Sequence, residues 1–257
     1  PNYIFRLYMA LGNYPQAAKT AIIIARQEQE LGNYRVAHQI LLDTHRELVL
    51  QKIRVPQELA HNLMLLHSYV LVKTLVKAED HLSGARMLVR VARNISKFPV
   101  HKVQILTSTV IECHRAGLRG SAFEHASTLV QPENRSQLQE QFKRKIEAIV
   151  RKAGDRSDVE EPETPSPFDP NALVAETTLE CPSTRNAIPY CVATGRHILL
   201  TDLTLCPSCN FPASFSAFTR LVEAEGACPM CLAQVPLSSI AKMDQVDALA
   251  WLKRHSA

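Results

Sequence analysis

Four cysteines near the end of the chain lie in two pairs of identical spacing. The pairs are Cys-Pro-Ser-Cys at residues 206–209 and Cys-Pro-Met-Cys at residues 228–231, with 18 residues between them. Two cysteines three residues apart on a tight turn can both reach one metal ion, and two such turns are typical of a tetrahedral zinc site. The sequence therefore predicts that Cys206, Cys209, Cys228 and Cys231 bind one Zn²⁺. Four sulfur ligands leave no position for water or substrate, so the ion is expected to be structural.

Two other uses of paired cysteines fit the sequence less well. A disulfide framework is typical of secreted proteins, but nothing marks this chain as secreted, and its total of seven cysteines is odd. A thioredoxin-like redox pair would need a strand–helix–strand pattern around a Cys-x-x-Cys sequence, and neither pair has one. The metal site is the preferred interpretation, and both alternatives stay open at this point.

Three further candidate ligands precede the two pairs. Cys181, Cys191 and His197 could hold a second ion together with a fourth, unidentified ligand, or the two cysteines could be buried thiols. A gap of nine residues between Cys181 and Cys191 is not the spacing of a single metal-binding turn. We therefore expect one zinc ion, and a second ion is the weaker alternative.

The first 152 residues show the apolar periodicity of helices. Apolar residues recur at spacings of three and four, as at Leu59, Leu63 and Leu66, while glycine and proline fall between such runs. The sequence Leu-Gly-Asn-Tyr occurs at residues 11–14 and again at 31–34. This pattern predicts a series of paired helices.

A longer internal period supports the same interpretation. Pro99 and Pro132 lie 33 residues apart, and Gly84 and Gly117 have the same separation. Tetratricopeptide (TPR) repeats have a period of ~34 residues, with small residues where their two helices cross. The fold class predicted for the chain is mainly α: a TPR-like helical solenoid followed by a small α+β zinc-binding domain.

Charge divides the chain into three parts. Residues 1–152 hold 22 basic and 12 acidic residues, residues 153–170 hold one and six, and residues 171–257 hold six and seven. The middle part is also rich in proline, which is typical of an extended, solvated linker. The predicted domains are thus a solenoid at 1–152, an acidic linker at 153–170 and a zinc-binding domain at 171–257 that ends in an amphipathic helix.

The composition of the first domain favours a protein partner over other ligands. A solenoid leaves a long surface exposed for binding, and its excess of basic residues is either a solvated surface or a site for an acidic protein. The basic residues are spread along every predicted helix without interleaved aromatic residues, so we expect no nucleic acid partner. No run of ~18 uninterrupted apolar residues occurs, so we expect no membrane span.

No catalytic motif stands out. The sequence has no glycine-rich phosphate loop, no nucleophile elbow and no His-Glu-x-x-His pattern. His38 and His67 are interpreted as packed helix residues, and Cys113 as a buried small apolar residue. We therefore expect a protein that is not an enzyme.

Short secondary structure elements are expected around the cysteines. We predict strands at 187–192 and 197–205, a helix at 214–225 and a final helix at 239–254 capped by Ser238 or Ser239. The single tryptophan, Trp251, is expected to pack on the zinc module rather than bind a ligand.

The combination of these features resembles a known family. The Leu-Gly-Asn-Tyr repeats, the acidic proline-rich linker and the sequence Ile-Pro-Tyr-Cys-Val-Ala-Thr-Gly-Arg-His at 188–197, which leads into the two cysteine pairs, are similar to the C-terminal end of the WD-repeat subunits of intraflagellar transport complex A. The resemblance covers essentially the whole chain, and the cysteine-rich tail is its more specific part.

The resemblance implies a function. It implies a scaffold of retrograde ciliary transport that also helps membrane receptors to enter cilia. The implied partners are other complex A subunits and ciliary membrane cargo adaptors, and the implied locations are the cytoplasm, the cilium and the ciliary basal body. Carried over by position, the resemblance assigns metal binding to Cys206, Cys209, Cys228 and Cys231.

A different class of protein combines similar parts. Solenoids that end in RING-like domains occur in vesicle-tethering complexes and in ubiquitin ligases. A RING domain, however, has eight ligands with a Cys-x-His-x-x-Cys section, and the sequence lacks that section. The RING-like ligase or tethering subunit is therefore the alternative prediction.

Overall fold

The computed structural model describes residues 2–152, 154 and 156–255. It divides into two compact units, Pro1–Val159 and Glu160–Ala257. The first unit consists of stacked helices, and the second combines short strands with two helices and the four paired cysteines. The predicted fold class, a helical solenoid with a small α+β domain, is thereby confirmed.

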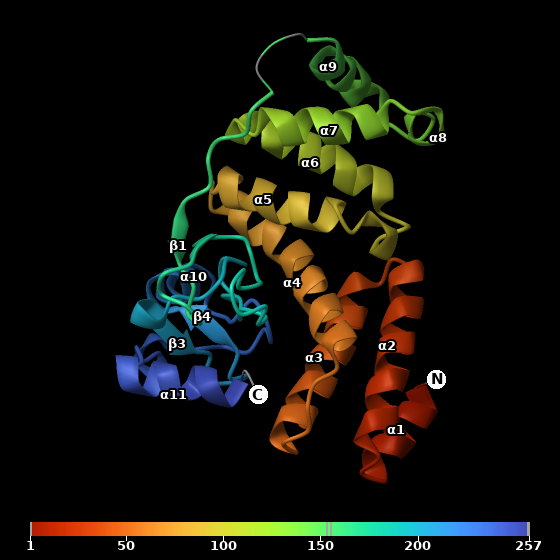
Figure 1. Cartoon of the computed structure of the whole chain (residues 1–257). Coiled ribbons are helices and arrows are strands. Elements are labelled where there is room, and N and C mark those ends of the chain that lie inside the picture. The colour runs from red at the N-terminus through yellow and green to blue at the C-terminus, as the bar shows by residue number, and fades with distance from the viewer. Residues whose placement is uncertain (1, 153, 155, 256–257) are drawn as a thin grey trace. The chain divides into compact units, whose positions relative to one another are not determined.

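The first unit is a stack in which each long helix packs against the next (Figure 1). Its helices are α1 (Asn2–Ala10), α2 (Tyr14–Glu30), α3 (Tyr34–Leu50), α4 (Gln57–Lys77), α5 (His81–Ala92), α6 (Lys102–Ala116), α7 (Arg119–Leu129), α8 (Pro132–Arg135) and α9 (Glu140–Arg151). One 3-10 turn, η1 (Ile95–Lys97), lies between α5 and α6.

The repeated Leu-Gly-Asn-Tyr sequence forms the turns around α2. Gly12 and Gly32 have φ of 68° and 82°, a left-handed conformation that glycine adopts without a steric penalty. Ala17 and Ala37, in the helix that follows each turn, have no exposed surface. Small residues at these places let neighbouring helices pack closely, so one short motif specifies both the turn and the packing.

Helix α4 is long and apolar enough to cross a membrane by length and composition alone. Half of its most apolar window is buried inside the unit, where α4 packs between α3 and α5. A core helix of a helical stack has the same properties. Its apolar residues, such as Leu63 and Leu66, are therefore accounted for by the core of the solenoid.

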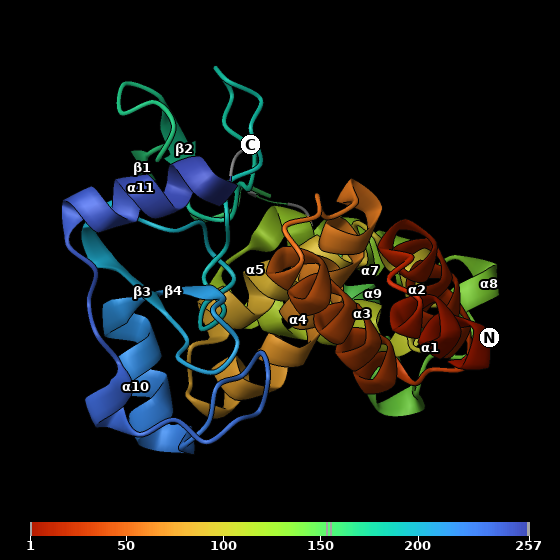
Figure 2. The same ribbon diagram turned by 90° about the horizontal axis from the view of Figure 1, so that it is seen from below.

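The described residues of the second unit, 160–255, form two antiparallel strand pairs, two helices and two 3-10 turns. They are β1 (Glu163–Pro165) with β2 (Leu173–Ala175), η2 (Leu200–Asp202), β3 (Leu203–Leu205) with β4 (Pro212–Ser214), α10 (Phe215–Glu225), η3 (Leu237–Ser239) and α11 (Gln245–His255). Figures 1 and 2 both show α10 and α11 on opposite sides of the β3–β4 pair.

Helix α10 forms where the sequence predicts it. The hydroxyl oxygen of Ser214 accepts a hydrogen bond from the amide of Ala217 and so caps the first turn. Gly226 ends the helix with φ of 74°. This cap and this stop are local signals, which explains why the prediction of residues 214–225 agrees with the structure.

The final helix begins later than predicted. It was expected from residue 239 with Ser238 or Ser239 as its cap, but α11 starts at Gln245, and Asp244 accepts from the amide of Asp247. Residues 240–243 instead run beside β3: the amide of Met243 donates to Leu203, and the carbonyl of Ala241 accepts from the Thr204 hydroxyl. The amide of Met243 and the carbonyl of Ala241 are thus bonded to β3 and do not form the hydrogen bonds of a longer helix.

Helix α11 is amphipathic, as predicted. Ala248, Trp251 and Leu252 are buried, whereas Val246 is 76% exposed. Trp251 packs with Ile198 and other core residues of this unit, as expected from the sequence.

The strands expected at 187–192 and 197–205 are wrong in extent. The structure has single antiparallel bridges at Glu180↔Ala187 and Tyr190↔His197, then the turn η2, and a regular strand only from Leu203 to Leu205. Each bridge closes a tight turn, and these turns together with η2 take the place of the longer predicted strands.

The boundary between the two units falls inside the predicted linker, residues 153–170. Asp158 belongs to the first unit and contacts Ser121 at the start of α7. Residues Glu163–Pro165 form β1 of the second unit. The predictions for residues 1, 153, 155, 256 and 257 lie outside the described residues.

Candidate metal centre

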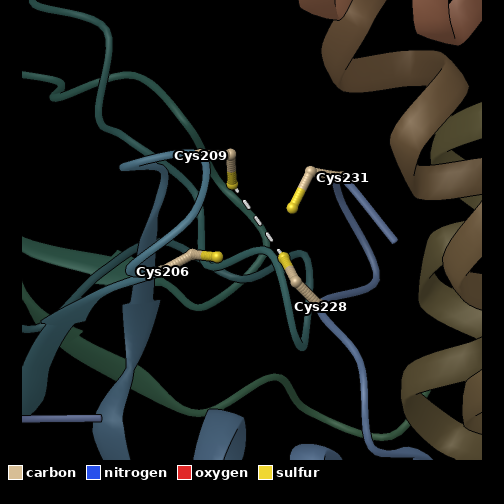
Figure 3. A group of neighbouring side chains, drawn as sticks. All are labelled: Cys206, Cys209, Cys228 and Cys231. Atoms are coloured by element: carbon tan, nitrogen blue, oxygen red, sulfur yellow. Dashed lines mark hydrogen bonds between the residues drawn. The ribbon is translucent and has the colours of Figure 1, made fainter. Parts of the chain in front are cut away.

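The sulfur atoms of Cys206, Cys209, Cys228 and Cys231 point toward one another from two turns (Figure 3). All four lie within 4.8 Å of one another, and the sulfurs of Cys209 and Cys228 are 4.0 Å apart. Four sulfurs at ~2.3 Å from one zinc ion would be ~3.8 Å apart in a regular tetrahedron. The arrangement thus matches a tetrahedral thiolate site closely enough that small side-chain movements would complete it.

Each cysteine pair is held by a turn with two backbone hydrogen bonds. The amide of Cys206 donates to the carbonyl of Phe211, and the carbonyl of Cys206 accepts from the amide of Asn210. The amide of Cys228 donates to Ala233, and its carbonyl accepts from Leu232. These bonds fix both ends of each turn and direct its two sulfurs to the same side.

The two turns require a left-handed residue directly after the second cysteine. Asn210 and Leu232 have φ of 59° and 61°. Asparagine tolerates this conformation, but a leucine there carries a steric cost. The proline after the first cysteine, Pro207 or Pro229, restricts that cysteine to extended backbone angles and so favours the turn.

The four thiols influence one another's ionisation. Hydrogen bonds among them raise the pKa of Cys209 and Cys228, with burial acting in the same direction, and lower the pKa of Cys206 and Cys231. Four thiolates at this separation would repel one another without a cation. A divalent ion that prefers sulfur, such as Zn²⁺, would allow all four to be deprotonated, so the donor set fits the predicted metal.

The surrounding elements hold the two turns in place. Strand β3 leads directly into Cys206, and its residues Leu203 and Leu205 pack with Trp251 of α11. Helix α10 connects the two turns, and Gly226 redirects the chain toward Cys228. The apolar core therefore supports the first turn, and α10 links the first turn to the second.

The other predicted ligands do not join a cluster. Cys181 lies with its sulfur 3.3 Å from the hydroxyl of Ser183, the sulfur of Cys191 accepts from the amide of Ser214, and His197 Nε2 is 2.6 Å from the hydroxyl of Thr164. Among the described residues, the four paired cysteines are the one group of three or more His, Cys, Asp or Glu side chains placed closely enough to share an ion.

The polar neighbours of Cys181 were not predicted from the sequence. Burial alone would raise the pKa of its thiol, but hydrogen bonds with Ser166, Ser183 and Thr184 lower this pKa to about 6. A signal was available, because the Cys-Pro-Ser sequence at 181–183 is repeated at 206–208.

The sequence matches a family model that spans the metal centre. The model is described as IFT121, second zinc finger domain, and it matches residues 189–236. This range contains Cys191 and His197 together with both cysteine pairs, and it excludes Cys181. The match supports zinc as the metal that this arrangement of thiols binds.

Curated proteins are similar along nearly the whole chain. WD repeat-containing protein 19 of Mus musculus is 56% identical over 241 residues, and that of Homo sapiens is 55% identical over 241 residues; each match covers 94% of this chain. WD repeat-containing protein dyf-2 of Caenorhabditis elegans is 40% identical over 231 residues, which cover 90% of this chain. The chain spans 17–18% of the length of these relatives. The chain therefore belongs, as a segment homologous to WD repeat-containing protein 19, to the WD-repeat subunits of intraflagellar transport complex A.

Proposed function

We propose that Cys206, Cys209, Cys228 and Cys231 bind one structural Zn²⁺ that holds the second unit together. The observation that carries this proposal is the convergence of four sulfurs within 4.8 Å from two turns of the same geometry. Closed coordination by sulfur leaves no position at which a substrate could be activated. The ion would thus contribute to folding and shape, and we propose a non-enzymatic role for the chain.

The role that fits this architecture is that of a protein-binding scaffold. Helical solenoids expose long surfaces that bind other proteins, and a metal-stabilised module of about 100 residues adds a second rigid surface. We propose that the chain acts as part of a complex A subunit in retrograde ciliary transport. Its partners would be other complex A subunits and the adaptors that bring membrane receptors into cilia.

The proposed location follows from the same relatives. A subunit of this complex would work in the cilium and would pass through the cytoplasm and the ciliary basal body. Homology to WD repeat-containing protein 19 and to dyf-2 supports the ciliary role, and the zinc finger match supports the metal.

The RING-like alternative predicts a different result in a simple assay. A RING domain holds two ions with eight ligands, whereas the paired cysteines here supply four. We expect no ubiquitin transfer when the purified chain is incubated with E1 and E2 enzymes. Polyubiquitin formed by the wild type and abolished by Cys206→Ser would replace our proposal with the ligase.

The scaffold role is tested in ciliated cells that produce the full-length protein in place of their own copy. We expect Cys206→Ser combined with Cys228→Ser to reduce the recovery of other complex A subunits and the number of retrograde trains. Cys113→Ser is the matched control, because Cys113 is a buried thiol of the first unit outside the cluster. Equal recovery for the double variant and the control would contradict the proposal.

A further inference from the structure

Within the described part of the second unit, four hairpins have the same geometry. Each is closed by an antiparallel bridge between two residues seven positions apart. The bridged pairs are Glu180↔Ala187, Tyr190↔His197, Leu205↔Pro212 and Ala227↔Gln234. A cysteine directly follows the first bridged residue in every case, so we name the hairpins after Cys181, Cys191, Cys206 and Cys228.

The backbone geometry of the four hairpins is the same. The cysteine amide donates to the carbonyl five residues later, and the cysteine carbonyl accepts from the amide four residues later; the bonds measure 2.7–3.0 Å. The fourth residue after the cysteine has positive φ in each hairpin. These residues are Arg185 at 60°, Gly195 at 72°, Asn210 at 59° and Leu232 at 61°. Such agreement over four copies identifies a structural repeat rather than four unrelated turns.

The hairpins differ at the third residue after the cysteine. This residue is Cys209 or Cys231 in the two hairpins of the metal centre, and it is Thr184 or Thr194 in the Cys181 and Cys191 hairpins. Thiolates are strong ligands of Zn²⁺, whereas an uncharged hydroxyl is not among its usual protein ligands. The first two hairpins therefore keep one of the two sulfurs that a metal-binding hairpin supplies.

Both threonine hydroxyls bond within their own hairpin. The Thr184 hydroxyl oxygen accepts from the amide of Asn186 at 3.4 Å, and the Thr194 hydroxyl oxygen accepts from the amide of Arg196 at 3.3 Å. In each case the donor lies two residues after the threonine. The threonine thus stabilises the turn with a local hydrogen bond of the kind that serine and threonine commonly form.

The remaining sulfurs also have hydrogen-bond partners. The hydroxyls of Ser166, Ser183 and Thr184 surround the sulfur of Cys181. The sulfur of Cys191 accepts from the amide of Ser214 at 3.2 Å in strand β4. Both cysteines are buried, with 0% and 1% of their surface exposed, so these partners take the place that solvent or a cation would otherwise fill.

The contact of Cys191 gives its hairpin a second role. The amide of Val192 donates to the carbonyl of Pro212 at 3.1 Å, next to the bond between Ser214 and Cys191. Strand β4, which contains Pro212 and Ser214, is the second strand of the Cys206 hairpin. The Cys191 hairpin thus extends the sheet edge of a metal-binding hairpin, and its sulfur forms one of the joining hydrogen bonds.

We propose that the four hairpins are copies of one structural repeat that is stabilised in two different ways. Zinc joins the Cys206 and Cys228 hairpins, whereas hydrogen bonds alone stabilise the Cys181 and Cys191 hairpins. We call this difference the division of the repeat. This inference rests on the proposed zinc site and adds that the unit holds one ion and not two. Cys181 and Cys191 are then hydrogen-bonded thiols in the core, and His197 is a partner of Thr164 rather than a ligand.

Metal analysis of the purified 257-residue chain tests this division directly. We expect one zinc per chain, and the same count in Cys181→Ser, in Cys191→Ser and in the double variant. A count of two in the wild type that falls to one in the double variant would overturn the division while leaving the four-thiolate site intact. A count of zero would overturn both the division and the proposed function.

Two matched substitutions compare the two kinds of hairpin directly. Cys209→Thr gives the Cys206 hairpin the Cys-Pro-Ser-Thr sequence of the Cys181 hairpin, and we expect this variant to lose zinc. Thr184→Val removes a hydroxyl from the Cys181 hairpin, and we expect it to lower stability with no change in zinc content. Loss of zinc in Thr184→Val, or its retention in Cys209→Thr, would contradict the division.

Titration with Co²⁺ covers the case in which a cysteine variant fails to fold. The charge-transfer absorption of Co²⁺–thiolate bonds reports on sulfur ligands, and it needs only the wild-type chain with its metal removed. We expect this absorption to reach its maximum at one equivalent. A second increase up to two equivalents would show that Cys181 and Cys191 also bind metal, and it would overturn the inference.

Discussion

Asp158 caps helix α7 through Ser121, although 37 residues separate the two in the sequence. The amide of Ser121 donates to Oδ1 of Asp158 at 3.0 Å, and the hydroxyl of Ser121 donates to Oδ2 at 2.5 Å. Leu118, at the N-cap position, has no polar side chain to do this locally. The Arg156 guanidinium lies 3.5 Å from the centroid of the Phe123 ring. The segment after α9 is therefore attached to the solenoid before the second unit begins.

Replacing Asp158 should destabilise the first unit. Asp158→Ala removes the acceptor of two hydrogen bonds at the start of α7, and losing an N-cap costs ~0.5–2 kcal/mol in proteins. Because Asp158 is exposed, we expect a loss of about 0.5–1 kcal/mol in the free energy of unfolding. Urea unfolding followed by circular dichroism measures it. The control is Glu124→Ala, which removes an exposed carboxylate from α7 itself. An equal loss of stability in the two variants would contradict the role of Asp158 as the cap of α7.

His38 should make the solenoid sensitive to acid. It is 1% exposed on α3, and its ring centroid is 5.5 Å from that of His67 on α4. Burial lowers the pKa of His38 to about 3, helped by the positive charges of His67 and Arg35. Between pH 6.5 and about 3 the unfolded chain binds a proton here that the folded chain does not. Stability is thus complete above pH 6.5 and falls as the pH decreases through this window.

The contribution of His38 can be isolated with a variant that does not titrate. We expect the free energy of unfolding of the wild type to lose roughly 3 kcal/mol more than that of His38→Gln between pH 7 and pH 4. His61→Gln is the matched control, because His61 is an exposed histidine of the same unit. Parallel pH profiles for the wild type and His38→Gln would show that protonation of His38 does not limit stability.

Leu232 should be a site where substitution stabilises the metal centre. It has φ of 61° and its side chain is 51% exposed, so the strain of the left-handed conformation is not offset by burial. Asn210 occupies the same place in the Cys206 hairpin. We expect Leu232→Asn to stabilise the unit by about 0.5–1 kcal/mol and to slow the loss of zinc to a chelator. Leu237→Asn, at an exposed leucine without positive φ, should do neither; a faster loss of zinc in Leu232→Asn would contradict the assignment of strain.

Removal of the metal should be visible in tryptophan fluorescence. Trp251 is the single tryptophan of the sequence; it is 4% exposed and packs with Leu203 of the strand that leads into Cys206. We expect a chelator to shift its emission to longer wavelength while most of the helical circular dichroism, which comes from the first unit, remains. Added zinc should reverse the shift, and Cys206→Ser should show the shifted emission without chelator. Unchanged emission after complete zinc removal would mean that the ion does not organise this core.

Features encoded over a few residues could be predicted from the sequence. The spacing of the cysteine pairs indicated that their sulfurs converge, and Ser214 and Gly226 marked the ends of α10. The Leu-Gly-Asn-Tyr motifs likewise marked two helix turns of the solenoid. In each case the residues that determine the structure are close in sequence to the feature they determine.

Features set by distant contacts could not be predicted in this way. The start of α11 depends on hydrogen bonds from residues 241–243 to strand β3, about 40 residues earlier, and helical periodicity carries no information about them. The cap of α7 by Asp158 likewise depends on a residue that is distant in the sequence. The hairpin repeat is a different case: the Cys-x-x-Thr sequences at 181 and 191 were present, but a search for metal ligands passes over threonine.

X-ray absorption at the zinc edge of the purified chain tests the central claim most directly, because it identifies the metal and its ligand atoms together. We predict a first coordination shell of four sulfur atoms at about 2.3 Å with no nitrogen or oxygen neighbour. A shell that contains nitrogen or oxygen, or fewer than four sulfurs, would contradict the assignment of Cys206, Cys209, Cys228 and Cys231 as the complete ligand set.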